Sequence, residues 1–554
     1  MNIASLAVKA YGLKAYMFER ALKDPFTSQK KVLAGFLSRH KNTRYGREHG
    51  FRDIRSIDDY RSRVPLNDYE TLRPYVDCLM RGEKNVLTAD KVTLFGVTSG
   101  TMGKPKHIPV TEYSRRKKKD VMDLWAYYAL RDHPGLLDGK ILAIVSPEKE
   151  GFTISKIPFG AESGHAYRNL PQAVRNLYAI PYEVFEIPDY ESKYYCILRI
   201  AAEENISTIA TLNPSTILLL CQRMEKVGAQ IIEDIRLGTL NEKLNVCCEI
   251  REKIEARLTP NPKRADELSE LARKRNGELL PMDIWPNLKL IECWKGGSVG
   301  VYISYLSKYF GPNTAIRDFG YLSSEARVSI PMCDSGCGGA LAITSNFYEF
   351  IPRNEMDKKD KRFLLSHQLD VGKEYYIILT TPGGLYRYNI DDIIRVSGFY
   401  KNTPVIEFVQ KGSIVSSVTG EKIYEIQIDE AVNKAAGLIG ANLQFFSACV
   451  EWQAIPRYAF IVEFMNELSR EGKVSLLKNI ENQLIRLNVE YDTKRRSQRL
   501  GSPVLKVVPQ GTFEEYRSRK VQQGSHDGQI KIPKLVTDVC FQDNFKVLEE
   551  IAVE

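Results

Sequence analysis

Between residues 139 and 330 the chain alternates strand candidates with helical segments, and this alternation restricts the possible folds most. Apolar runs at 140–146, 207–212 and 288–294 are strand candidates, and helical patterns fill 190–203 and 215–227, the second with Ser215 as its expected N-cap. Strand, Gly-rich turn and helix in repeated order predict a mainly parallel sheet covered by helices. Ligands of such sheets bind at the carboxyl ends of the strands.

Two sections of different character follow this alternation. Residues 315–409 contain several short strand candidates and are β-rich, whereas after about residue 411 helices and strands combine into what reads as a small α+β domain. We therefore predict an α/β protein. Its large N-terminal part has mixed sheets covered by helices plus a β-rich section, and its C-terminal part is smaller.

Composition narrows the class of protein. The chain has 554 residues, of which 43% are hydrophobic and 27% charged, as is ordinary for a soluble globular protein. The net charge of +9 is compatible with anionic substrates and too weak to indicate nucleic acid. The apolar runs fall short of the length of a membrane span, and residues 1–23 have the spacing of an amphipathic helix. The ten cysteines form no C-x-x-C pair, which predicts reduced thiols in a cytoplasmic protein.

The stretch Thr98-Ser99-Gly100-Thr101-Met102-Gly103-Lys104-Pro105-Lys106 lies between two strand candidates. Glycine allows close approach of backbone N–H groups to an anion, and the hydroxyls and lysines add donors and positive charge. Pro105 after Gly103-Lys104 excludes a Walker A loop. Taken alone, the stretch is either a phosphate-binding loop or an ordinary connection. Residues 115–119, five consecutive charges on the next helix, point in every direction, so we expect a solvated helix start.

Three further groups of residues carry chemistry compatible with this loop. Tyr321, Ser324 and Glu325 follow a short strand, Asp392 lies within a later strand, and Lys531 stands in a polar loop near the end of the chain. Hydroxyls and lysines suit a triphosphate, Glu325 suits Mg²⁺, Asp392 a ribose diol, and Lys531 a developing charge. Taken singly, Glu325 could be a surface carboxylate, Asp392 a turn residue and Lys531 a solvated lysine.

In this order and spacing the set resembles the plant auxin- and jasmonate-conjugating acyl acid amido synthetases and their bacterial relatives. That family belongs to the adenylate-forming superfamily, which includes firefly luciferase. The likeness covers nearly the whole chain. It rests on the loop at 98–106, Gly320-Tyr321-Leu322-Ser323-Ser324-Glu325, Leu385-Tyr386-Arg387-Tyr388-Asn389-Ile390-Asp391-Asp392 with Gly398-Phe399, Gly420-Glu421-Lys422, and Gly528-Gln529-Ile530-Lys531-Ile532-Pro533-Lys534. Asp391 departs from the family, which usually has glycine before the aspartate.

The resemblance implies ATP and Mg²⁺ as cofactors and a two-step reaction. A small carboxylic acid forms an acyl-adenylate with release of pyrophosphate, and an amine, expected to be that of an amino acid, then displaces AMP. It implies an adenylation domain at 1–411 and a mobile domain at 412–554. Lys531 and Glu325 would be catalytic, with Glu325 also the metal residue. The implied ATP contacts are Ser99, Gly100, Thr101, Gly103, Lys106, Tyr321, Ser324, Asp392, Phe399 and Lys422.

The acyl pocket and the acceptor stay open at this point. Candidate pocket residues are Trp294, Gly297, Ser298 and Val299, although aromatic residues there could equally be core. A thiol acceptor, coenzyme A or a carrier protein, uses the same first step. A protein that binds nucleotide or acid without turnover is the alternative from another class. We expect a monomer without nucleic-acid or membrane partners.

Overall fold

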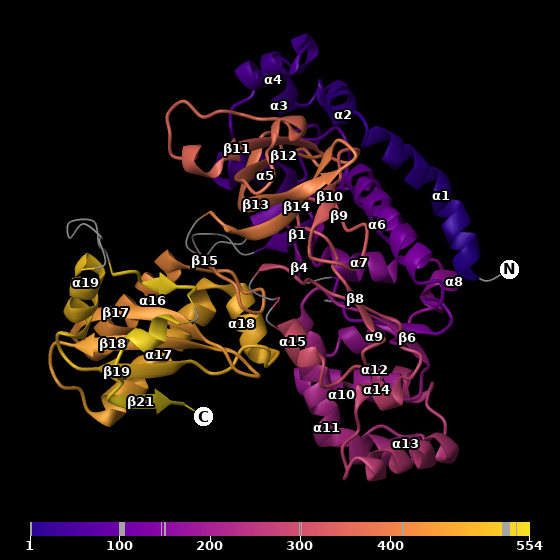
Figure 1. The fold of residues 1–554 in the computed structure, drawn as a ribbon, viewed down its shortest axis with the longest axis vertical. Coiled ribbons are helices and arrows are strands. Elements are labelled where there is room, and N and C mark those ends of the chain that lie inside the picture. The colour runs from indigo at the N-terminus through magenta and orange to yellow at the C-terminus, as the bar shows by residue number, and fades with distance from the viewer. Residues whose placement is uncertain are drawn as a thin grey trace. The chain divides into compact units, whose positions relative to one another are not determined.

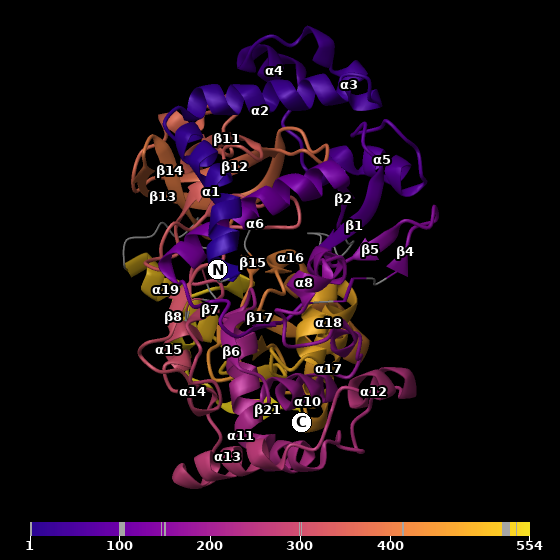
Figure 2. The ribbon, with the colours of Figure 1, turned by 90° about the vertical axis from the view of Figure 1, so that its right-hand side faces the viewer.

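The computed structural model describes residues 3–98, 106–145, 147–148, 151–297, 300, 302–412, 415–522, 532–538 and 540–553. The chain divides into two compact units, one built from Met1–Val97 and His107–Gln410 and the other around Lys411–Glu554. Figure 1 and Figure 2 show the ribbon from two sides. No described helix combines the length and apolar character that a bilayer crossing needs.

The first unit contains the parallel sheet predicted from the alternation. Its described strands run in the order β3-β6-β7-β8 and all pair in parallel: β3 (Lys140–Ala143), β6 (Ile206–Ala210), β7 (Leu290–Glu292) and β8 (Ala315–Arg317). Leu142 and Ile209 pack one face of this sheet against α10 (Tyr190–Ala201) and α11 (Pro214–Leu237). The short helices and outer elements of this region are α7 (Glu162–Arg168), α8 (Gln172–Arg175), α9 (Tyr182–Phe185), α12 (Cys248–Glu255), α13 (Pro262–Lys274), α14 (Pro281–Ile284) and α15 (Tyr302–Leu306).

A second sheet of the first unit carries the β-rich section. Its order is β11-β12-β13-β14-β10-β9, with β9 (Ser329–Ile330), β10 (Gly339–Leu341), β11 (Phe347–Pro352), β12 (Glu374–Thr380), β13 (Tyr388–Tyr400) and β14 (Thr403–Lys411). A smaller sheet has the order β2-β1-β5-β4, formed by β1 (Val92–Thr98), β2 (Lys106–Thr111), β4 (Gly151–Phe152) and β5 (Pro158–Gly160).

The N-terminal helices and α6 (Glu112–Asp132) bind these sheets together. α1 (Ile3–Ala21) lies along α6 in both ribbon views, where Lys14 pairs with Asp120 and Asp123 at 2.7 Å. One continuous core includes Phe18, Trp125, Leu290 and Tyr348. The remaining N-terminal helices are α2 (Pro25–His40), α3 (Arg44–Glu48), α4 (Ile57–Arg63) and α5 (Tyr69–Met80).

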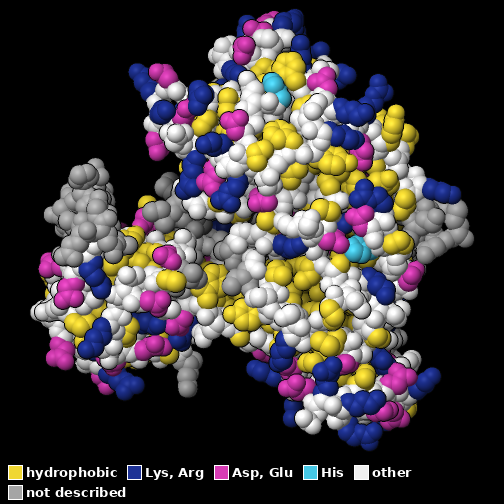
Figure 3. Space-filling model, viewed as in Figure 1, with side chains coloured by type: hydrophobic (Ala, Val, Ile, Leu, Met, Phe, Trp, Pro, Cys, Tyr) yellow, Lys and Arg dark blue, Asp and Glu magenta, His cyan; other side chains and the backbone are white. Residues whose placement is uncertain are grey.

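The second unit is an α+β structure with its own core. Its main sheet has the order β20-β17-β18-β19-β21 and is packed by α16 (Glu425–Ile439) and α17 (Arg470–Leu487). The strands are β17 (Leu443–Glu451), β18 (Arg457–Phe464), β19 (Val504–Val508), β20 (Leu535–Val536) and β21 (Glu549–Ala552), with a separate pair β15 (Val415–Ser416) and β16 (Ile423–Tyr424) and helices α18 (Val489–Arg496) and α19 (Thr512–Gln522). Basic and acidic side chains are interspersed on the face shown in Figure 3.

The predicted α/β class is confirmed. α5 runs without a break through Pro74, with Asp68 and Thr71 forming its capping box. The prediction of Ser215 as a helix N-cap is wrong. The helix expected to begin at Ser215 is instead capped by Asn213, whose side chain accepts a hydrogen bond from the Ser215 N–H. Pro214 then occupies the first helical position, where its missing N–H costs nothing.

Candidate functional site

The second and third motifs meet at one buried hydrogen bond in the first unit. The Tyr321 hydroxyl donates to Oδ2 of Asp392 at 2.5 Å. Tyr321 follows β8, whereas Asp392 lies in β13, 71 residues further along the chain. Burial, reinforced by the Asp392 carboxylate, raises the pKa of Tyr321 well above its usual value, so the hydroxyl remains a proton donor. The structure thus brings together two residues predicted to bind ATP.

The predicted acyl pocket turn lies beside this pair. The Trp294 indole N–H donates to the carbonyl oxygen of Gly320 at 3.1 Å, next to Tyr321. A Cβ on Gly297, which has φ +63°, would lie 3.4 Å from the Phe408 ring, and that ring lies 5.7 Å from the Tyr321 ring between centroids. Trp294 and Gly297 are therefore close to the second motif, while Ser298 and Val299 lie outside the described residues.

Asp318 ties the two loops to each other. Its carboxylate accepts the backbone N–H of Lys295 and that of Gly320, each at 2.6 Å, and the residue is 4% exposed. Burial raises the pKa of Asp318 to about 6, although the hydrogen bonds from Lys295 and Gly320 act in the opposite direction. A charged group is thus kept in an unfavourable environment at the position where both loops leave the parallel sheet.

Glu325 is a buried carboxylate without a structural role in the described residues. It is 8% exposed, and its carboxylate makes no hydrogen bond or ion pair with any described residue. Buried polar groups normally have partners, so an unpaired carboxylate at this position suits a bound cation. The described residues contain no cluster of three or more His, Cys, Asp or Glu side chains that could hold a metal, but Mg²⁺ needs only one or two carboxylates beside substrate phosphates.

The charged run at 115–119 is not simply a solvated helix start, and that prediction is wrong. Lys117 donates to the carbonyl oxygen of Thr344 at 3.2 Å, and burial lowers its pKa. Lys118 is 12% exposed, donates to the carbonyl oxygen of Ser324 at 2.8 Å, and pairs with Glu162 at 2.5 Å. Only one face of α6 meets solvent, so consecutive charges cannot all share one environment.

Other predicted site residues lie elsewhere. Phe399 is 41% exposed and lines a cleft with Lys23, Phe26 and His367. Both Asp392 and Phe399 belong to β13, so the strand rise separates them by roughly 23 Å. The two residues are therefore not brought together.

The remaining predicted residues have the following positions. Lys106 is the first residue of β2 and is half-buried. Lys422 lies in the second unit with φ +49°, and its carbonyl oxygen accepts a hydrogen bond from Asn488. Ser99, Gly100, Thr101, Gly103 and Lys531 fall outside the described residues.

Asp391 resolves the question raised by the third motif. It adopts φ +62°, the left-handed region that glycine occupies without strain and that aspartate tolerates better than most residues. Its N–H donates to Oδ1 of Asn389 at 2.9 Å, which supports the turn locally. Asp391 therefore adopts a backbone conformation that is open to glycine as well.

Residues 14–315 match the GH3 family N-terminal domain, 339–411 the GH3 family central domain, and 426–539 the GH3 family C-terminal domain. The chain belongs to the GH3 family. This confirms the resemblance drawn from the motifs.

Similar GH3 proteins span nearly the whole chain. The indole-3-acetic acid-amido synthetase GH3.10 of Arabidopsis thaliana is 26% identical over 565 residues, covering 95% of each chain. The jasmonoyl-L-amino acid synthetase JAR4 of Nicotiana attenuata is 25% identical, covering 94% of this chain and 92% of the relative. Among solved structures, the AtGH3.15 acyl acid amido synthetase in complex with 2,4-DB has a TM-score of 0.66 at 22% identity, covering 97% and 96% of the two chains, and shows the shared fold.

Proposed function

We propose that this GH3 protein is an ATP-dependent acyl acid amido synthetase. A carboxylate oxygen of a small acid attacks the α-phosphorus of ATP, forming an acyl-adenylate and releasing pyrophosphate. An amine, for which an amino acid is the best candidate, then attacks the acyl carbon, so that an amide forms and AMP leaves. The observation that carries the proposal is the buried contact between Tyr321 and Asp392, which joins the second and third motifs of a family with amido synthetase members.

The chemical need for adenylation is simple. A free carboxylate is a poor electrophile because its leaving group would be oxide, and AMP is a far better one. The protein then has to position two reactants and stabilise developing charge. Tyr321 orients the Asp392 carboxylate. That carboxylate is suited to accept the ribose hydroxyls, with Ser324 and Lys106 as further ATP contacts.

Glu325 is the residue we propose for Mg²⁺. It fits because it is buried and has no partner among the described residues, on the loop that begins with Tyr321. Bound Mg²⁺ would offset the negative charge of the triphosphate. We expect Glu325→Gln to raise the Mg²⁺ concentration needed for half-maximal activity by about 10- to 100-fold, with little change in thermal stability.

The substrates are proposed by chemical class. The acyl acid would lie against Trp294 and Gly297, with Ser298 and Val299 completing the turn, and no single acid is assigned. The curated relatives are named as enzymes that conjugate acids to amino acids, which favours an amine acceptor over a thiol. The ten cysteines are all free, which supports the cytoplasm as the compartment.

Lys531 is the residue we propose for the first half-reaction, on a mobile domain of residues 412–554. Removing a donor to a developing charge typically lowers the rate by about 10² to 10³. Lys531→Ala should therefore slow acid-dependent pyrophosphate exchange by that factor and leave aminolysis of a supplied acyl-adenylate much less affected.

Lys534→Ala is the matched control for Lys531. Lys534 lies 3.8 Å over the Phe446 ring, and its N–H donates to Glu425 at 2.8 Å, both within the second unit. Its loss should affect the local packing more than the chemistry. Equal damage by both substitutions would remove the role assigned to Lys531.

The test of function is a library experiment. Pyrophosphate exchange is measured with a panel of carboxylic acids, and the active acid is then supplied with amino acids or with coenzyme A. We expect exchange with at least one acid and an amide product. A thioester as the sole product would overturn the acceptor class. Nucleotide binding without exchange across a broad panel would favour the binding-protein alternative.

A further inference from the structure

One helix, α6, holds both the second motif and the chain just before it. Lys118 donates to the carbonyl oxygen of Ser324, and the Trp125 indole N–H donates to the carbonyl oxygen of Asp318 at 2.9 Å. These two residues are seven apart, so they lie on one face of the helix about 10 Å from each other. The Trp125 ring also stacks on Phe319 at 5.5 Å.

The position of Lys118 costs free energy of hydration. Its side chain is only 12% exposed, so the ammonium group loses most of its hydration. The Glu162 carboxylate at 2.5 Å and the Ser324 carbonyl at 2.8 Å offset that loss. A methionine of similar length would fill the same space without this penalty. The charge of Lys118 is therefore best explained by its hydrogen bond to the backbone carbonyl of Ser324.

The group that Lys118 holds is the backbone of the loop. Within the loop, Ser323 donates its N–H to the carbonyl oxygen of Ala326, and Tyr321 donates its N–H to the Ser329 hydroxyl. Among the described residues, the Lys118 side chain provides the hydrogen bond from another element to the Ser324 carbonyl oxygen. Glu325 is the next residue, so the direction of its carboxylate depends on the peptide that Lys118 fixes.

We propose that Lys118 is a positioning residue that sets the orientation of Ser324 and Glu325 for MgATP. This inference rests on the proposed function for the meaning of Glu325, but the constraint on the loop does not. Glu162 plays the supporting role of holding the ammonium group toward Ser324. This contact could not be predicted from the sequence, because Lys118 and Ser324 are 206 residues apart.

The test compares Lys118→Met with Lys119→Met. Lys119 is the adjacent residue, 67% exposed, and its partner Asp123 also binds Lys14, so its loss leaves no charge unpaired. Amide hydrogen exchange of a peptide covering 319–328 is measured without ligand. Lys118→Met should speed exchange there about tenfold, as expected for loss of a charge-assisted hydrogen bond. Lys119→Met should match the parent, and equal exchange in the two variants would overturn the proposal.

A second readout separates positioning from general stability. With the active acid, Lys118→Met should raise the Mg²⁺ concentration for half-maximal pyrophosphate exchange by about 10- to 100-fold, and Lys118→Arg should restore most of the loss. Glu162→Gln should have a smaller effect. An unchanged Mg²⁺ dependence in Lys118→Met would contradict the role toward Glu325. If the parent supports no exchange with any acid, the proposed function fails, and the ligand-free exchange result still decides whether Lys118 holds the loop.

Discussion

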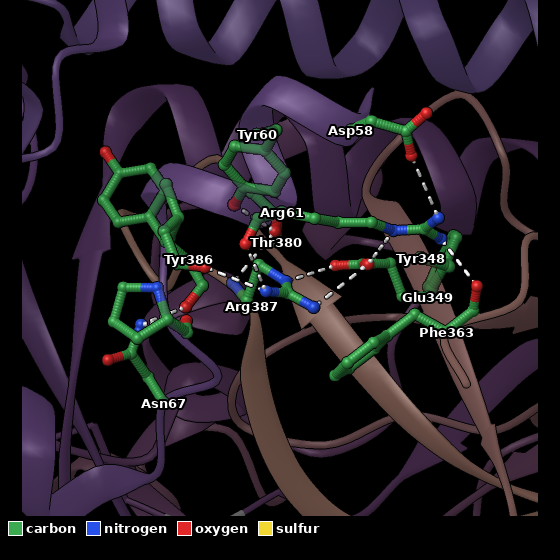
Figure 4. Close-up of polar contacts among 12 residues, drawn as sticks. Asp58, Tyr60, Arg61, Asn67, Tyr348, Glu349, Phe363, Thr380, Tyr386 and Arg387 are labelled. Atoms are coloured by element: carbon green, nitrogen blue, oxygen red, sulfur yellow. Dashed lines mark hydrogen bonds and ion pairs between the residues drawn. The ribbon is translucent and has the colours of Figure 1, made fainter. Parts of the chain in front are cut away.

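The third motif contains two regions that use buried polar groups differently. At its start, Arg387 is 3% exposed and bonds Glu349 at 2.9 Å and the carbonyl oxygen of Val64 at 2.8 Å. Glu349 is fully buried and also binds Arg61 at 2.9 Å, as Figure 4 shows. At its end, Asp392 meets Tyr321 near Glu325, whose buried carboxylate has no partner among the described residues.

The difference separates a structural cluster from the proposed binding site within one motif. The Glu349 carboxylate is satisfied by two guanidinium groups, one from α4 and one from the chain just before β13, which indicates a structural role. The loop with Glu325 carries a mostly buried carboxylate that has no hydrogen-bond or ion-pair partner among the described residues. Burial of charge alone therefore does not indicate a ligand site, whereas an unsatisfied buried charge does.

We expect the largest effect from Arg387→Met, which removes one of the two arginine partners of Glu349. Arg387→Met leaves Glu349 fully buried with only Arg61 as its ionic partner, and breaking a buried pair typically costs about 3–5 kcal/mol. We expect a loss of that size in the free energy of unfolding, measured by chemical denaturation. Arg61→Met should cost less, because Arg61 is 22% exposed and Arg387 still pairs Glu349. If the Arg387→Met protein had normal stability but weakened ATP binding, the structural role assigned to Arg387 would be wrong.

The next effect concerns Asp318, the charged group between the two loops of the site. Its pKa is raised from 3.8 to about 6, so the native state binds more protons than the unfolded state between these values. Stability from this residue is therefore highest below about pH 4 and falls by about 3 kcal/mol as the pH rises to 6. The difference in unfolding free energy between parent and Asp318→Asn should show this slope. A difference that stays constant from pH 4 to 7 would contradict it.

Asp392→Asn tests whether the end of the third motif serves ATP binding and not stability. The amide oxygen can still accept the Tyr321 hydroxyl, so stability should be nearly unchanged. The loss of a charged acceptor for hydroxyl groups should weaken ATP binding by about 10- to 100-fold. Equilibrium nucleotide binding and thermal unfolding measured together check this. Loss of stability with unchanged ATP affinity would place Asp392 in the structural half of the motif.

The smallest effect concerns the turn before Asp392. Asp391→Gly and Asp391→Ala both remove the carboxylate, but only glycine adopts φ +62° without a steric penalty. We expect the glycine variant to be about 1 kcal/mol more stable than the alanine variant. Equal stability would show that the left-handed turn does not constrain this position.

The sequence predicted the elements better than their contacts. Alternation and apolar runs predicted the parallel sheet, and the motifs pointed to Tyr321 and Asp392, which the structure brings into contact. Asp318 and Lys118 lie outside those strings, and their roles depend on tertiary pairing. Within 115–119, helical periodicity could not say which lysines face the protein, because that depends on what packs against α6. Phe399 was grouped with Asp392 because both belong to one motif. Both residues lie in the extended strand β13, so they are far apart in space although they are close in sequence.

The proposed function requires that the protein cleaves ATP between the α- and β-phosphates to activate a carboxylic acid. The direct measurement is identification of the nucleotide and phosphate products after turnover with an active acid and an amino acid. We expect AMP and pyrophosphate in equal amounts, together with one amide per ATP. ADP and inorganic phosphate as the products would contradict it.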